Sequence, residues 1–150
     1  MRKFTKVIGA VLLLAFVSTN LKAQDITDAD LKDYAIILLA QKSITDKISP
    51  MVNEQIAAQE GIDGKRYAEL NKAAKGKIEN LPADATDFEK QFYDIVQKRV
   101  DKKMKGASTV VNTLASNGLG AKKYKAIRTA IKSDSDMKAK VEGYMAGLSM

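Results

Sequence analysis

The sequence GIDGKRYAEL occupies residues 61–70, and a similar sequence, GLGAKKYKAI, occupies residues 118–127. Both have a glycine, an aliphatic residue, two adjacent basic residues, a tyrosine and a second aliphatic residue in the same order. This repeat motif consists of Gly61, Ile62, Tyr67 and Leu70 in the first copy and of Gly118, Leu119, Tyr124 and Ile127 in the second. Similarity at a fixed spacing indicates that one supersecondary unit occurs twice in the chain.

The similarity extends beyond the motif. When Gly61 is placed on Gly118, the same shift aligns most of residues 25–82 with residues 83–150, and for example places residues 30–31 on residues 87–88. A small gap is needed only before Gly61. We therefore expect two internal repeats, about 25–82 and 83–150, within one domain of residues 24–150.

Apolar residues in the first repeat have helical spacing. Leu31, Tyr34 and Leu38 fall on one face of a helix, for which Thr27 or Asp28 can be the N-cap. In the next segment, Ser49-Pro50 has the pattern of an N-cap followed by the first helical residue. Pro50 either separates two helices or kinks one long helix, and the sequence leaves both alternatives open.

The second repeat begins with a capping box, Thr86 to Glu89, and then has helical spacing up to residue 116. Within this predicted helix, Gly106 is the residue with the lowest helix propensity. The expected inward residues are Phe88, Phe92, Ile95 or Val96, Arg99 or Val100, and Met104. A last helix follows, with Ser133 or Ser135 as its cap and with Met137, Val141, Tyr144 and Leu148 on one face.

The repeat motif itself predicts the end of one helix and the start of the next. Gly61 and Gly118 suit the left-handed residue after a helix, and Asp63 and Gly120 stand where the next helix is capped. Sustained period-two alternation, typical of strands, is absent from the sequence. We expect an all-α fold: a single helical bundle built from two duplicated helical hairpin units plus a C-terminal helix.

Residues 1–23 have the three parts of a secretory signal peptide. A short basic start is followed by an uncharged, mostly apolar run at residues 7–17 and by a polar segment that ends at Ala23. A membrane-spanning helix needs about 20 apolar residues, more than this run provides. We expect cleavage after Ala23, and a soluble, periplasmic or secreted chain with no transmembrane segment.

Cleavage would change the charge of the chain. The full sequence has a net charge of +7, but residues 1–23 hold four cations and no acid, which leaves 21 basic and 18 acidic residues. A net charge of +3 gives little support for nucleic-acid binding. The basic residues are concentrated in the second repeat, at Lys98, Arg99, Lys102, Lys103 and Lys105, and again at Lys122 and Lys123. They predict either a polyanion-binding surface or an ordinary solvated face.

Composition also argues against catalysis. The chain has no His and no Cys, so the commonest general base, the thiol nucleophile and the usual zinc ligands are missing. Carboxylates cluster at residues 28–33 and 134–136, where capping of a helix start is the simpler role. We expect no catalytic residue, no cofactor and no metal site. Tyr67, Tyr124, Tyr144 and the methionines can either line a pocket or fill the core.

Residues 118–145, GLGAKKYKAIRTAIKSDSDMKAKVEGYM, resemble the domain-of-unknown-function 4168 family of small secreted bacterial helical proteins. The matching pattern is a Gly-Leu turn, a Tyr, an Ile and a Ser-Asp before the last helix. Gly120 and Ser135 depart from it, since the family often has Ser or Thr and Pro at these positions. The resemblance implies a helical fold and an exported protein, and it implies no site residues.

These observations lead to one functional hypothesis and one alternative. We expect a non-enzymatic, exported helical module of the bacterial cell envelope that binds another envelope protein in an apolar groove between the two hairpins. The alternative is a periplasmic protein that binds an anionic envelope polymer, another polyanion or a small ligand through the basic second repeat. Nucleic acid is not an expected partner.

Overall fold

A computed structural model describes residues 25–149, and these residues form an all-α fold without strands. The predicted signal peptide, residues 1–23, lies outside the described residues. The α-helices are α1 (Asp28–Thr45), α2 (Ile48–Ala57), α3 (Gly64–Ala74), α4 (Asp87–Leu114), α5 (Ala121–Ala130) and α6 (Ser135–Leu148). A 3-10 turn, η2 (Ile78–Asn80), follows α3, and a π-helical turn, η3 (Ala115–Leu119), joins α4 to α5.

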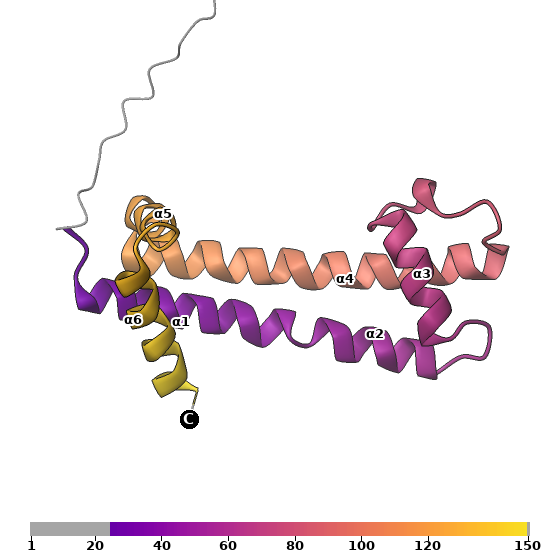
Figure 1. Cartoon of the computed structure of the whole chain (residues 1–150), viewed down its shortest axis with the longest axis horizontal. Coiled ribbons are helices and arrows are strands. Elements are labelled where there is room, and N and C mark those ends of the chain that lie inside the picture. The colour runs from indigo at the N-terminus through magenta and orange to yellow at the C-terminus, as the bar shows by residue number, and fades with distance from the viewer. Residues whose placement is uncertain (1–24, 150) are drawn as a thin grey trace, which may run out of the picture.

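The helices form two long antiparallel rods with short helices across both ends (Figure 1). Helices α1 and α2 follow each other almost in line and make the first rod, and α4 alone makes the second. Helix α3 crosses the end where α4 begins, while α5 and α6 pack at the end where α1 begins. Each short helix therefore covers the start of a long helix from the other half of the chain.

The hydrophobic core is divided between the two ends of the rods. The cluster at the α3 end consists of Ile62, Tyr67, Leu70, Ala74, Ala85, Tyr93 and Val96. The cluster at the α5 and α6 end consists of Leu31, Tyr34, Ala35, Ile127 and Val141. Between them lies a much smaller cluster of Ile37, Val111 and Ala115. The aliphatic and tyrosine residues of the motif, Ile62, Tyr67, Leu70, Leu119, Tyr124 and Ile127, pack in or against these clusters, as does Tyr144.

The two ends use the same contacts. At the α3 end the rings of Tyr67 and Tyr93 lie 5.8 Å apart, and at the other end the rings of Tyr34 and Tyr124 lie 5.1 Å apart. Capping boxes begin both long helices: Thr86 is the N-cap of α4 as expected, and of the candidates Thr27 and Asp28 the N-cap of α1 is Thr27. Thr27 and Thr86 are 59 residues apart, whereas Gly61 and Gly118 are 57 residues apart.

Pro50 does not mark the helix boundary itself. Helix α1 ends at Thr45, and α2 begins at Ile48 with Lys47 as its N-cap. The prediction that Ser49 is the N-cap is therefore wrong, and Pro50 is the third residue of α2. Proline is tolerated there because the amides of a first helical turn have no intrahelical partner. The chain thus has two separate helices rather than one kinked helix.

The expected left-handed conformation of Gly61 and Gly118 is also wrong. Within residues 25–149, positive φ angles occur at Lys75, Gly76 and Gly120. At Gly61 crowding instead disfavours a side chain, since a Cβ atom there would overlap the ring of Phe88. At Gly118, inside η3, a Cβ atom would meet nothing within 4 Å.

Three further sequence predictions need correction. Phe88 and Met104, which the spacing places inward, are 46% and 44% exposed, and of the alternatives Ile95 and Val96 the buried residue is Val96. Besides Val96, helix α4 is buried along Tyr93, Ala107 and Val111, on the side toward α1 and α2. The N-cap of α6 is Asp134, whose carboxylate accepts a hydrogen bond from the amide of Met137, rather than Ser133 or Ser135. Leu148 is exposed.

Among residues 25–149, no helix combines the length and the apolar character that crossing a bilayer requires.

The two glycines of the motif allow a matched test. Gly61→Ala should lower the free energy of unfolding by about 1 kcal/mol, because the new methyl group displaces the Phe88 ring. Gly118→Ala should leave it within about 0.5 kcal/mol of the parent or raise it, since the space is open and the residue is helical. Urea unfolding of both variants measures the difference, and equal effects would contradict the role given to Phe88.

Candidate functional site

A groove opens at the middle of the molecule, where the break between α1 and α2 faces α4. Its volume is about 440 Å³. We call it the waist groove, and its lining residues are Ile44, Met51, Arg99, Lys102, Lys103 and Gly106. Ile44 is on α1 just before the break and Met51 is on α2 just after it, so residues on both sides of the break form one wall.

The local sequence explains why this place is hollow. The first rod loses its regular helix at residues 46–47, and the two large core clusters lie at the ends of the molecule. On the facing wall, Gly106 contributes no side chain, and a Cβ atom there would touch nothing within 4 Å. Apolar side chains from α1 and α2 therefore form one side of an open groove rather than a packed core.

Basic side chains line the other side. Lys102 and Lys103 follow Arg99 by three and four positions on α4, so all three share one face of the helix. Arg99 and Lys102 are exposed and Lys103 is half-buried. None of the three forms an ion pair with an acid of residues 25–149, and no acidic residue lines the groove. Three uncompensated cations beside an apolar wall attract an anionic group that carries apolar parts.

The other predicted basic residues do not join this site. Lys98 pairs with Asp94 at 2.6 Å, and Lys105 does not line the groove. Lys122 and Lys123 are on α5, at one end of the molecule, and the ammonium group of Lys123 pairs with Asp30 at 2.9 Å. The structure thus brings together only Arg99, Lys102 and Lys103 from the predicted set.

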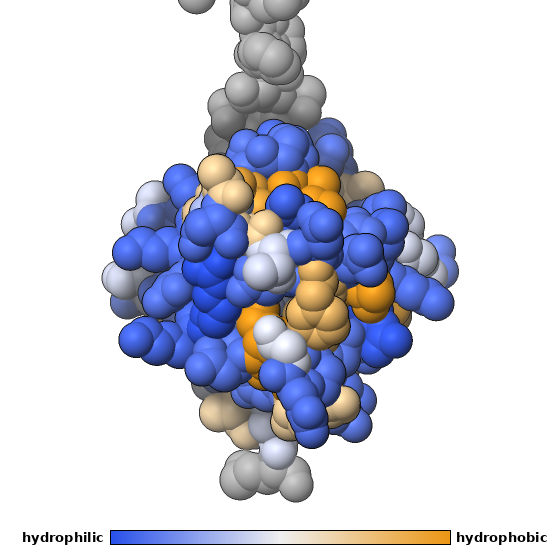
Figure 2. Space-filling model, turned by 90° about the vertical axis from the view of Figure 1, so that its right-hand side faces the viewer, coloured by the Kyte–Doolittle hydropathy of each residue, from blue (hydrophilic) through white to orange (hydrophobic). Residues whose placement is uncertain are grey.

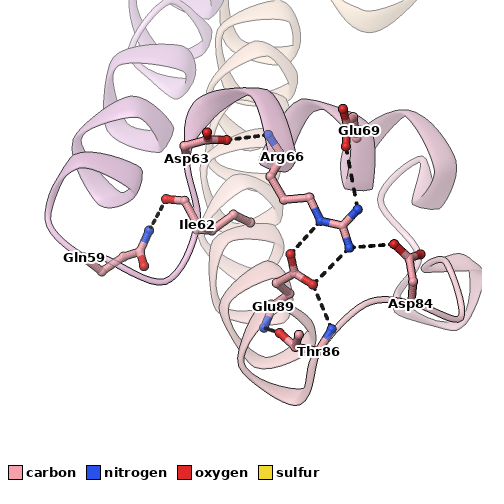
Figure 3. A network of polar contacts seen from close by, with 8 residues as sticks. All are labelled: Gln59, Ile62, Asp63, Arg66, Glu69, Asp84, Thr86 and Glu89. Atoms are coloured by element: carbon pink, nitrogen blue, oxygen red, sulfur yellow. Dashed lines mark hydrogen bonds and ion pairs between the residues drawn. The ribbon is translucent and has the colours of Figure 1, made fainter.

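A second hollow, of about 600 Å³, lies beside the loop between α2 and α3 and has Arg66 at its edge. Arg66 is already committed to carboxylates (Figure 3). Its Nε atom lies 2.6 Å from Glu89, and its terminal nitrogens lie 3.1 Å from Asp84 and 3.7 Å from Glu69. Because its donors are occupied in this way, Arg66 holds α3 on the start of α4 and offers little to a ligand.

The buried member of this network is Glu89. Hydrogen bonds from Arg66 and from the amide of Thr86 lower the pKa of Glu89 to about 2. Burial raises the pKa of Asp30, at the equivalent place of α1, but hydrogen bonds from Thr27 and Lys123 outweigh burial and the pKa is lowered. General acid catalysis near neutral pH needs a carboxyl pKa that is raised. Both perturbed carboxylates therefore have structural roles.

No group of three or more potential metal ligands occurs within residues 25–149. Comparison of the chain with models of protein families, with curated proteins and with solved structures finds no match. The resemblance to the domain-of-unknown-function 4168 family stays a prediction from the sequence motif.

The ion pair of Glu89 predicts how stability depends on pH. Since the pKa of Glu89 is lowered from its ordinary value of 4.5 to about 2, its contribution is complete above pH 4.5 and is lost as the pH falls toward 2. Between pH 5 and pH 2 the parent should lose roughly 1–3 kcal/mol more stability than Glu89→Gln, which keeps the cap but has no charge. Denaturant unfolding across this range measures the difference.

Glu69→Gln is the control, because it removes a half-exposed carboxylate near the same Arg66. It should change stability by less than about 0.5 kcal/mol. Parallel pH profiles of the parent and Glu89→Gln would mean that the ion pair contributes nothing.

Proposed function

We propose that this chain is an exported, non-enzymatic binding module of the bacterial cell envelope, and that the waist groove is its contact surface. The observation that carries the proposal is the pairing of an apolar wall, Ile44 and Met51, with three cations of α4 that lack ion-pair partners within residues 25–149. Perturbed carboxylates with structural roles, together with the absence of His and Cys from the sequence, favour binding over catalysis.

The groove suits a protein partner with both apolar and acidic side chains. An apolar side chain of the partner would bury its surface against Met51 and Ile44, which supplies most of the binding energy. Carboxylates beside it would meet Lys102 and Lys103, which speeds association and fixes orientation. The proposed partner is therefore an envelope protein that presents an acidic segment with an apolar anchor.

We also propose that the scaffold is an internal duplication of one helical hairpin unit. Equivalent contacts at the two ends support it: the capping boxes at Thr27 and Thr86 and the tyrosine pairs described above. The ion pair of Arg66 with Glu89 also has its counterpart in Lys123 with Asp30. A duplication would give both ends of the molecule the same capping, tyrosine and ion-pair contacts, and the halves would differ mainly in the middle.

A polyanion, such as an acidic envelope polymer, is the alternative ligand. The unpaired cations at the groove favour it as well, since a polyanion needs charge but no apolar wall. Met51→Ser separates the two: it should weaken a protein complex and leave retention on a heparin column unchanged. The double variant K102E/K103E should elute from the column at a lower salt concentration than the parent. K122E/K125E has the same net charge and should elute at a salt concentration closer to that of the parent.

Site-specific crosslinking tests the proposed contact surface. A photoreactive amino acid at Lys102 should capture one reproducible protein in the native envelope, because this side chain borders the groove. The same amino acid at Lys105, an exposed lysine of the same helix outside the groove, should capture much less. Mass spectrometry identifies the captured species, and equal background from both positions would contradict the proposal.

Export is tested by the mass of the chain isolated from cells that produce it. We expect a mature chain that begins at Gln24 or Asp25, since cleavage is proposed after Ala23. Leu13→Arg should block processing, because a charge interrupts the apolar run. A full-length chain found in the cytoplasm would show that residues 1–23 do not act as a signal peptide.

A further inference from the structure

A polar pocket lies between α1, α4 and α5, at the end of the molecule where α5 packs (Figure 1). Its volume is about 300 Å³, at the lower end of the range for sites that hold a small molecule. We call it the tyrosine pocket, and its polar lining residues are Tyr34, Gln41, Ser108, Asn112, Tyr124 and Arg128. On each helix the lining includes residues three or four positions apart, so each helix turns one face toward the pocket.

The hydroxyl group of Tyr34 has no hydrogen-bond partner in the part of the chain that the structure describes. The residue is 2% exposed, and the tyrosine hydroxyls that form hydrogen bonds there belong to Tyr67 and Tyr93. Polar side-chain atoms that are shielded from solvent all have partners among residues 25–149. The oxygen of Tyr34 must therefore open into the pocket that it lines.

The corresponding tyrosine at the other end shows what Tyr34 lacks. Tyr93 follows the N-cap of α4 by seven positions, as Tyr34 follows the N-cap of α1. The hydroxyl of Tyr93 donates to the side chain of Asn71 at 3.0 Å and accepts from the amide of Gly76 at 2.9 Å. Asn71 is the fourth residue after the motif tyrosine of α3, and the fourth after that of α5 is Arg128. Because a guanidinium cannot accept a hydrogen bond, the proton of Tyr34 has no acceptor there.

A second difference affects Tyr124. Its counterpart in the motif, Tyr67, accepts a hydrogen bond from Gln97 at 3.1 Å, and Leu38 takes the place of Gln97 on α1. A hollow of about 370 Å³ lies at the α3 end as well, but Tyr67, Asn71 and Gln97 in its lining already bind within the protein. Figure 2 views that end, where apolar surface shows as separate patches within a hydrophilic surround. The α3 end thus uses these polar groups for its own fold, whereas the α5 end leaves them free.

The chemistry of the lining indicates an acidic ligand. Within residues 25–149 the ion pair of α5 joins Lys123 to Asp30, so Arg128 has none, and no acid lines the pocket. A guanidinium binds a carboxylate through two parallel hydrogen bonds. Burial and the neighbouring hydroxyl of Tyr124 raise the pKa of Tyr34, and Arg128 offsets only part of this rise. Tyr34 therefore keeps its proton near neutral pH and can donate a hydrogen bond to the same carboxylate.

The rest of the lining suits a ligand with hydroxyl groups. The amide groups of Gln41 and Asn112 and the hydroxyl of Ser108 both donate and accept hydrogen bonds, as a ligand hydroxyl does. Leu38 and Val111 supply a smaller, apolar part of the lining. An entirely apolar ligand would cover the hydroxyl of Tyr34 without giving it a partner, which costs free energy.

We propose that the tyrosine pocket binds a small carboxylic acid that carries hydroxyl groups, such as a sugar acid. The carboxylate of the ligand lies between Arg128 and Tyr34, and its hydroxyl groups meet the side chains on the α1 and α4 walls. The pocket shares no lining residue with the waist groove, so this inference goes beyond the proposed function and does not depend on it.

Isothermal titration calorimetry of residues 24–150 with defined sugar acids tests the ligand class. At least one of glucuronate, galacturonate and gluconate should bind with a dissociation constant of about 1 mM or lower, which is reachable for a ligand of this size. Glucose lacks the carboxylate, and acetate and inorganic phosphate lack the sugar hydroxyls, so each should bind about tenfold more weakly or worse. Binding of none of the three acids, or equal binding of acetate or phosphate, would overturn the proposal.

Arg128→Asn tests the site by giving it the side chain found at the other end. It removes the charge and supplies Tyr34 with an acceptor, so the dissociation constant of the sugar acid should rise about tenfold or more, while the urea midpoint stays equal or rises. Lys125→Asn is the matched control, because it removes the same charge from an exposed position of α5 outside the pocket. It should leave the constant within about threefold. Equal effects of the two variants would mean that net charge alone attracts the ligand, against a built site.

Tyr34→Phe and Tyr93→Phe separate binding from folding. Tyr93→Phe removes a hydroxyl with two partners in the protein, so it should lower the urea midpoint and leave the dissociation constant within about threefold. Tyr34→Phe removes a hydroxyl without such partners, so it should raise the constant about fivefold or more and leave the urea midpoint nearly unchanged. If Tyr34→Phe lowers stability and does not change the binding of the sugar acid, the pocket belongs to the fold alone and the proposal is wrong.

Discussion

The structure depends on one kind of contact, a carboxylate in the first turn of a long helix that also binds a cation from a short helix. Glu89 accepts a hydrogen bond from the amide of Thr86 and pairs with Arg66, and Asp30 does the same with Thr27 and Lys123. The chain has no cysteine, so no disulfide can hold these segments together. Each carboxylate also lies near the positive end of its helix dipole, which favours its charged form.

These contacts determine where the hydrophobic core can form. Since α3 is held on the start of α4 and α5 on the start of α1, the tyrosine of each short helix packs against a tyrosine of a long helix. Two separate cores result, each built from both halves of the chain, so neither half can bury its apolar residues alone. The middle of the molecule keeps only the small cluster around Ile37 and Val111. That uneven distribution leaves room for the waist groove.

The sequence predicted those features that depend on neighbouring residues. Helical spacing identified the all-α fold, and the caps at Thr27, Asp63 and Thr86 followed from side chains within the same turn. Contacts between distant residues could not be predicted. A side chain at Gly61, in the loop before α3, would crowd Phe88 of α4, and a glycine in a motif gives no sign of such crowding. For the same reason, helical spacing assigns Phe88 to the inward side of α4 and leaves Ile95 and Val96 as alternatives, although Tyr93 and Val96 are the residues that are buried.

The basic residues illustrate the same limit. Lys102 and Lys123 look alike in sequence, but Lys123 meets Asp30, from the opposite end of the chain, and becomes part of the scaffold. Elsewhere on α4 the chain does place acids near cations, as with Asp94 and Lys98. Three cations kept together without such a partner repel one another, which lowers the stability of the isolated chain. An acidic partner at the groove would remove that repulsion on binding, so the cost in the free chain becomes a source of affinity and of specificity in the complex.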